Sequence, residues 1–136
     1  MSYSLINLNM ESKIIMKSII VSMVAAAGLM VAGAAMAVDM PEGAKKNGCT
    51  ACHAIDKKVV GPAWQDVANK YKGAKTISLE GKEYPLEEGL IVKVSKGGKG
   101  NWTAVTGGVA MIANDPEGKK QPEMKALVDF ILGLAK

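Results

Sequence analysis

The only two cysteines and the only histidine of this 136-residue chain lie together in the run Cys49-Thr50-Ala51-Cys52-His53. The C-x-x-C-H spacing is that of a covalent haem attachment site. Residues three apart share one face of a helical turn, so both thiols can add to vinyl groups on the same edge of a haem. The imidazole of His53 can then reach the iron. We therefore expect one haem c, attached through Cys49 and Cys52, with His53 as an iron ligand.

Three other kinds of site use the same residue types. A redox dithiol of the thioredoxin type follows a β-strand, whereas the residues before Cys49 have a helical pattern. A structural zinc ion needs four nitrogen or sulfur ligands, and the chain has only three such side chains. A disulfide between Cys49 and Cys52 would strain the short loop and leave His53 without a role. Haem attachment is the interpretation that uses all three side chains.

The first 37 residues are expected to be a signal peptide, followed by one domain at residues 38–136. Lys17 precedes an apolar run at residues 19–31, and Ala35-Met36-Ala37 has the A-x-A pattern of a cleavage site. An uncleaved membrane anchor is the alternative, but the run is short and rich in Ala and Gly. Residues 1–15 do not resemble the start of a signal peptide, which favours Met16 as the start of translation. We expect export to the periplasm.

Lysine supplies all of the positive side-chain charge: the chain has 17 lysines and no arginine. Residues 38–136 contain 15 of them against 12 acidic residues, a net charge of +3. Arginine forks perform much of nucleic-acid recognition, so a nucleic-acid partner is not expected. Two groups of lysines have two interpretations: the first is an ordinary solvated face, and the second is a docking surface that attracts an acidic redox partner. These lysines are Lys45, Lys46, Lys57, Lys58, Lys93, Lys96 and Lys99.

Helix start and stop signals predict an all-α domain with three to four helices. The expected helices cover about 39–48, 62–73, 85–97 and a segment that begins at 122. Asp39 would cap the first helix, and Pro62 would be the first residue of the second. Residues 75–84 favour a small hairpin. Residues 97–121 contain six glycines and are expected to be a loop, which at that length is usually functional.

A low-spin electron-transfer haem needs a second iron ligand opposite His53, and without another histidine the candidates are thioether sulfurs. The expected mature chain has three, in Met40, Met111 and Met124. Met40 belongs to the expected helix before the haem motif, and Met124 fits the apolar stripe of the last helix. Met111 lies in the glycine-rich loop, where flexible backbone can bring its sulfur over the haem. We predict Met111; a five-coordinate iron with Met111 buried nearby is the alternative.

With these motifs in order, the chain resembles the small bacterial class I cytochromes c, periplasmic electron carriers with a single haem. The resemblance covers residues 39–136 and rests on four motifs and an apolar terminal helix. The motifs are Cys49-Thr50-Ala51-Cys52-His53, Val60-Gly61-Pro62-Ala63-Trp64, Gly100-Asn101-Trp102 and Met111-Ile112-Ala113-Asn114. It implies that the first and last helices cross and that the helices wrap around the haem.

The resemblance also implies roles for three residues around the haem. The Pro62 carbonyl would accept a hydrogen bond from the His53 ring, which fixes the tautomer of the imidazole. Trp102 would donate to a haem propionate, and Asn114 would reach the Met111 sulfur. Two stretches differ from the family pattern: residues 75–88 are longer than in the shortest members, and Ile-Ala follows Met111 where proline is frequent.

The function expected from two protein ligands on one iron is electron transfer between Fe(II) and Fe(III), without enzyme activity or a small-molecule substrate. The alternative is a haem protein with an open or displaceable distal site, either gas-binding or peroxidase-like, although no distal His or Arg exists to activate a peroxide. Expected partners are redox proteins: a membrane quinol-oxidising complex or a cytochrome as donor, and an oxidase or reductase as acceptor. The carrier is expected to be a monomer.

Overall fold

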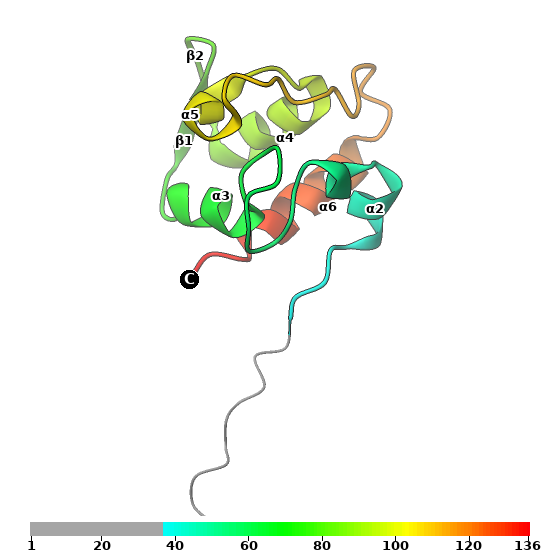
Figure 1. The fold of residues 1–136 in the computed structure, drawn as a ribbon. Helices are drawn as coiled ribbons and strands as arrows, with labels where there is room; N and C mark the ends of the chain where they lie inside the picture. The colour runs from blue at the N-terminus through cyan, green and yellow to red at the C-terminus, as the bar shows by residue number, and fades with distance from the viewer. Residues whose placement is uncertain (1–36) are drawn as a thin grey trace, which may run out of the picture. The chain divides into compact units, whose positions relative to one another are not determined.

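A computed structural model describes residues 37–136 of the chain. The expected signal peptide therefore lies, except for Ala37, outside the described residues and stays a prediction. The described part is mostly helical, as expected, with a small two-stranded sheet (Figure 1). Its α-helices are α2 (Glu42–Lys46), α3 (Trp64–Lys70), α4 (Leu86–Lys96), α5 (Thr103–Thr106) and α6 (Gln121–Leu132). It also contains two 3₁₀ turns, η1 (Cys49–Ala51) and η2 (Gly100–Trp102), and two strands, β1 (Thr76–Leu79) and β2 (Lys82–Pro85).

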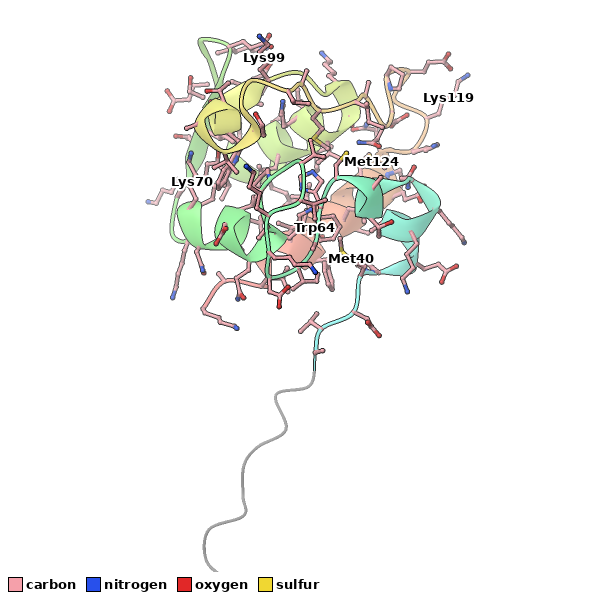
Figure 2. All side chains as sticks on the ribbon, viewed as in Figure 1. Met40, Trp64, Lys70, Lys99, Lys119 and Met124 are labelled. Atoms are coloured by element: carbon pink, nitrogen blue, oxygen red, sulfur yellow. The ribbon has the colours of Figure 1, made fainter. Side chains whose placement is uncertain are left out.

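Helix α6 organises the packing, because α2, α3 and α4 all contact it (Figure 1). Its buried stripe consists of Met124, Leu127, Val128 and Ile131, as the predicted 3.6-residue period requires. Met124 is fully buried, which confirms its expected place in the core, and it lies inside the domain while labelled lysines such as Lys119 project outward (Figure 2). None of the helices at residues 37–136 is long and apolar enough to cross a membrane.

The first and last helices meet as expected. A Cβ atom on Gly43 of α2 would lie 3.7 Å from Cδ2 of Leu127 in α6, so the two helices approach closely at this residue. The side-chain amide of Asn47 donates to the Gly43 carbonyl and to Glu123 Oε1, each at 2.8 Å. This contact fixes the chain just before the haem motif against the start of α6.

The predicted hairpin is confirmed and lies against α4. Strands β1 and β2 pair antiparallel, with Ile77 opposite Tyr84. Ile77 and Leu79 are buried while their neighbours in β1 are exposed, the alternation typical of a strand with one covered face. The Asn101 side chain donates to the Ser78 carbonyl at 2.9 Å, so the hairpin also supports the segment that contains Trp102.

Two helix starts differ from the predictions. Pro41, not Asp39, is the N-cap of α2, and no side chain caps this short helix. Helix α3 begins at Trp64 rather than Pro62, after Ala63 as its N-cap. The reason is that the preceding loop satisfies the first N–H groups of α3: Trp64 N donates to the Ala54 carbonyl at 3.0 Å.

The expected long loop is partly helical. Between residues 97 and 121 the chain forms η2 and α5, each a single turn. The four residues of α5 contain no glycine, and the turn is closed where Gly108 N donates to the Thr103 carbonyl at 3.2 Å. The segment that carries Met111 is therefore held by local structure on its N-terminal side.

Candidate haem site

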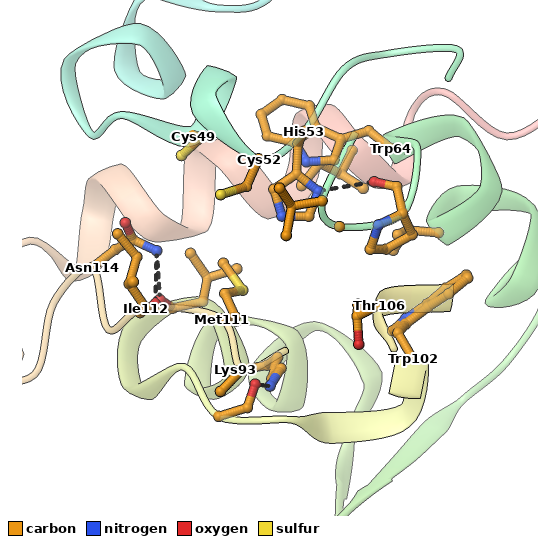
Figure 3. Close-up of a pocket in the computed structure, with 18 of the residues that line it drawn as sticks. Cys49, Cys52, His53, Trp64, Lys93, Trp102, Thr106, Met111, Ile112 and Asn114 are labelled. Carbon is orange, nitrogen blue, oxygen red and sulfur yellow. Dashed lines mark hydrogen bonds between the residues drawn. The ribbon is translucent and has the colours of Figure 1, made fainter. Parts of the chain in front are cut away.

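The residues of the haem motif form a closed turn. The Cys49 carbonyl accepts hydrogen bonds from Cys52 N at 3.1 Å and from His53 N at 2.9 Å. This confirms the predicted helical turn and places both thiols on one wall of a cavity (Figure 3). Neither cysteine is in a disulfide, and burial raises the pKa of the Cys49 thiol. Both sulfur atoms are thus available to form thioether bonds.

The His53 ring is oriented by the Pro62 carbonyl, which lies 2.8 Å from Nδ1, as expected (Figure 3). A proton on Nδ1 leaves Nε2 as the acceptor that can bind a metal. Burial lowers the pKa of His53, while the hydrogen bond to Pro62 opposes this effect. The neutral imidazole, the form that binds iron, is therefore favoured near neutral pH.

Gly61 allows the histidine ring to pack directly on the backbone. A Cβ atom at this position would lie 2.5 Å from Cε1 of His53, which is closer than two carbon atoms can approach without a shift. Gly61 N also donates to the Cys52 carbonyl at 2.8 Å, so the loop closes over the motif. The Gly61-Pro62 pair is visible in the sequence, where it predicts a helix start and not this contact with His53.

Trp64 supports His53 from the core side. Its ring centroid lies 6.1 Å from that of His53 and 6.0 Å, edge-on, from that of Phe130 in α6. Only 4% of Trp64 is exposed, and the residue also lines the cavity. Trp64 therefore packs in the core and forms part of the cavity wall next to His53.

Met111 is placed by a two-bond backbone bridge and not by a flexible loop. Gly98 N donates to the Met111 carbonyl at 2.9 Å, and Met111 N donates to the Gly98 carbonyl at 3.0 Å. Gly97 precedes this bridge with φ of 72°, and a Cβ there would lie 2.4 Å from the Met111 carbonyl oxygen. Figure 3 shows the Met111 side chain across the cavity from His53. From the sequence alone, residue 97 marks only the end of an expected helix.

Asn114 anchors the same segment from the other side of Met111. Its side-chain amide donates to the Val94 carbonyl of α4 at 3.1 Å and to the Ile112 carbonyl at 3.4 Å (Figure 3). In the described structure this amide has no recorded hydrogen bond to the Met111 sulfur. The main chain adds a further bond, from Asn114 N to the Val94 carbonyl at 3.3 Å. Asn114 therefore ties the Met111 segment to α4.

Lys93 was expected in an exposed lysine group, but the structure places it half-buried in the cavity wall. Its Nζ donates to the Gly97 carbonyl at 3.0 Å and also to the Gly98 carbonyl. Burial lowers the pKa of Lys93, an effect that the charge of Glu80 partly offsets. Sequence reasoning missed this role because spacing alone does not distinguish a buried lysine from a solvated one.

Trp102 lines the cavity on the side away from the two cysteines (Figure 3). It is half-buried, and the Nζ atom of Lys70 lies 4.4 Å from its ring centroid, a cation–π geometry. Thr106 lies near Trp102 in the same figure, and its buried hydroxyl oxygen has no hydrogen-bond partner in the described structure. No sequence signal singled out Thr106.

The cavity that these side chains share encloses about 1180 Å³, including the part open to solvent. The remaining lining is largely apolar and includes Val60, Val67, Leu90, Val94, Leu127, Val128 and Ile131. The cavity therefore fits a covalently attached haem. It is largely apolar, and its wall contains two thiols, an imidazole with a free Nε2, a thioether and a threonine whose hydroxyl has no partner.

Comparisons with known proteins give the same answer, although no protein-family model matches the chain. Cytochrome c-551 of Allochromatium vinosum is 41% identical over 93 residues, which cover 67% of this chain and 81% of that protein. Cytochrome c-552 of Hydrogenobacter thermophilus is 36% identical over 118 residues, which cover 87% and 97%. The crystal structure of Nitrosomonas europaea cytochrome c552 matches with a TM-score of 0.52 and 36% identity, over 68% of this chain and 95% of that one.

The chain therefore belongs to the small bacterial class I cytochromes c, a family of haem-based electron carriers. It carries one haem c, attached through Cys49 and Cys52. The all-α fold with a small hairpin and the haem that the sequence predicted are confirmed.

Proposed function

We propose that the protein is a periplasmic electron carrier in which His53 and Met111 bind opposite sides of a single low-spin haem iron. The observation that carries the proposal is the placement of these two side chains across one cavity (Figure 3). When bound, the haem supplies a one-electron couple between Fe(II) and Fe(III). The chain supplies the two ligands and the apolar surroundings.

The two ligands are held by different parts of the backbone. His53 is oriented by the Pro62 carbonyl and packs on Gly61, while Met111 is bridged to Gly98. Because neither attachment depends on the iron, both side chains can keep their places in either oxidation state. Such rigidity favours fast electron transfer. Because both side chains occupy the iron, no coordination site is left for oxygen or peroxide. The protein is accordingly proposed to act as a carrier and not as an enzyme.

Trp102 and Asn114 are proposed to have different roles, Trp102 at the haem itself and Asn114 at the Met111 segment. Trp102 lines the side of the cavity opposite the cysteines, which supports a hydrogen bond from its indole N–H to a haem propionate. Asn114 is proposed to act through the backbone, because its amide holds the Val94 and Ile112 carbonyls. Apolar residues cover much of the remaining wall, which favours the less charged ferrous site and a positive reduction potential.

Replacement of Met111 by alanine tests the ligand assignment. The Met111→Ala protein should retain covalent haem, have a lower reduction potential and bind carbon monoxide when reduced, because one coordination position is open. Met124→Ala is the matched control, since Met124 is fully buried in the core. If the wild-type protein bound carbon monoxide as readily as Met111→Ala, the distal site would be open and the gas-binding alternative would replace this proposal.

Docking of redox proteins is proposed to involve the lysines around the haem motif. Lys45, Lys46, Lys57 and Lys58 are all exposed. The rim of the cavity also has exposed apolar side chains, with Val109 54% and Ile112 67% exposed. A partner would then combine acidic groups with an apolar contact. The docking role is tested with the double variant Lys57→Glu/Lys58→Glu. Its control, called here the hairpin control, is Lys75→Glu/Lys82→Glu at the β-hairpin, which changes the net charge by the same amount and alters no residue of the cavity wall.

Export to the periplasm is proposed from the pattern at residues 1–37. Cleavage after Ala37 would give a mature protein that begins at Val38. Cell fractionation with N-terminal sequencing of the haem-stained band would test both points. A cytoplasmic protein, or one that keeps the apolar run, would contradict them.

A further inference from the structure

The hydroxyl of Thr106 is the one buried side-chain polar atom among residues 37–136 that has no hydrogen-bond partner. Such an atom is costly, because burial removes its water and nothing replaces the lost hydrogen bond. A threonine in a helix usually relieves this by bonding to a carbonyl one turn earlier. Thr106 ends the one-turn helix α5, and the structure records no such bond. Thr106 also lines the haem cavity, so this unused donor belongs to a residue of the cavity wall.

The backbone keeps this donor in place. Gly107 caps α5 with φ of 64°, and Val109 N donates to the Thr106 carbonyl at 3.3 Å. In Figure 3 the hydroxyl lies near Trp102, on the opposite side of the cavity from Cys49 and Cys52. Its position relative to the cysteines is what identifies its partner.

Attachment through the cysteines determines which edge of the haem faces Thr106. The thioether bonds form at the two vinyl groups, and the propionates occupy the opposite edge of the porphyrin. The propionate carboxylates are the only strong hydrogen-bond acceptors on the periphery of the ring. The half-buried ammonium group of Lys93 also lines the cavity, which makes the site more favourable for an anion.

We infer that the Thr106 hydroxyl donates a hydrogen bond to a haem propionate. The inference rests on the haem seating described under Proposed function. Thr106 would thus be a cofactor-binding residue contributed by α5, a turn within the segment that the glycine-rich sequence predicts to be a loop. A hydrogen bond to the ionised carboxylate stabilises its charged form and lowers its affinity for a proton.

Thr106→Val removes the donor and keeps the shape of the side chain. The proton affinity of the propionate should then rise roughly tenfold, as expected for loss of one hydrogen bond to a charged group in a partly solvated site. The reduction potential of a haem falls with pH over the range in which a propionate loses its proton. This range should therefore move to higher pH by about one pH unit in Thr106→Val. Thr106→Ser retains the hydroxyl and should behave as the wild type does.

Thr103→Val is the matched control, because Thr103 is exposed on the same turn. The reduction potential of each protein would be measured across pH by spectroelectrochemistry, and the propionate bending modes would be recorded by resonance Raman spectroscopy. A shift of both readouts in Thr106→Val, absent from the serine variant and the control, supports the inference. Thr106→Ala provides the same test if the valine variant does not load haem.

Two results would overturn the inference. In the first, Thr106→Val has the same pH dependence and propionate modes as Thr103→Val. In the second, the reduction potential of Thr106→Val changes equally at all pH values, and the methionine-to-iron charge-transfer band of its ferric visible spectrum moves. That result would mean that the hydroxyl acts on the Met111 sulfur. A wild-type protein without that band would instead contradict the ligands under Proposed function, so the two failures are distinguishable.

Discussion

Replacement of Gly61 by alanine should loosen His53, the first proposed iron ligand, while its imidazole and both thiols stay in the chain. The new Cβ would lie 2.5 Å from Cε1 and 3.0 Å from Nδ1 of the ring. Carbon atoms in contact are about 3.5 to 4.0 Å apart, so the ring or the loop must retreat by roughly 1 Å. The bond between Nδ1 and the Pro62 carbonyl, 2.8 Å long, would lengthen beyond the usual hydrogen-bond range as a result.

The cost of this change can be worked out from its two parts. A steric insertion into a packed site costs about 1 to 3 kcal/mol, and loss of a hydrogen bond costs about 0.5 to 1.5 kcal/mol. The free energy of unfolding should therefore fall by roughly 1.5 to 4.5 kcal/mol. For a domain of this size each kcal/mol lowers the melting temperature by about 4 to 8 °C. The expected decrease for Gly61→Ala is thus at least about 6 °C.

Thermal unfolding of the haem-loaded protein, followed by circular dichroism and haem absorbance, measures this effect. Gly43→Ala is the control, because its Cβ would meet its nearest neighbours at 3.6 to 3.7 Å, an ordinary contact distance, within helix α2. That change should be neutral or stabilising by up to about 1 kcal/mol. The reasoning would be refuted if the two variants melted at the same temperature with the same haem spectrum.

Three further changes test the Met111 segment, the core and the surface in turn. Gly97→Ala places a Cβ 2.4 Å from the Met111 carbonyl oxygen at a φ of 72°. The free energy of unfolding should fall by at least about 2 kcal/mol, and the ferric methionine-to-iron band should weaken, both measured by absorbance during denaturant titration. Met124→Ala empties a fully buried site and should cost about 2 to 5 kcal/mol in chemical denaturation while that band persists. Lys57→Glu/Lys58→Glu should lower the electron-transfer rate with an acidic partner and flatten its salt dependence in stopped-flow mixing, whereas the hairpin control should not. A salt-independent wild-type rate would instead indicate an apolar contact.

The haem motif could be predicted from the sequence because its geometry is local. The turn at residues 49–53 is closed by bonds between residues three and four apart, so the residue types and spacing were sufficient. The apolar stripe of α6 is local in the same sense, since it repeats every turn of one helix. The choice of Met111 used the same information by elimination, because Met124 fitted that stripe.

Other contacts around the site could not be predicted because they depend on how separate segments of the chain pack together. The partner of Asn114 is the Val94 carbonyl, 20 residues away, and depends on how α4 packs. The half-buried state of Lys93 depends on the carbonyls beyond the end of its own helix. Helix α3 starts late because Ala54, ten residues earlier, accepts the Trp64 N–H. Each of these follows from tertiary packing, which overrides local helix and loop signals.

The identity of the second iron ligand is tested most directly by proton–carbon NMR of the reduced protein with ¹³C-labelled methionine methyl groups. The ring current of the porphyrin shifts the methyl group of an axial methionine far upfield, away from all others. One such resonance should appear in the wild-type protein, disappear in Met111→Ala and remain in Met40→Ala and Met124→Ala. An upfield methyl that survives in Met111→Ala, or none in the wild-type protein, would contradict the account.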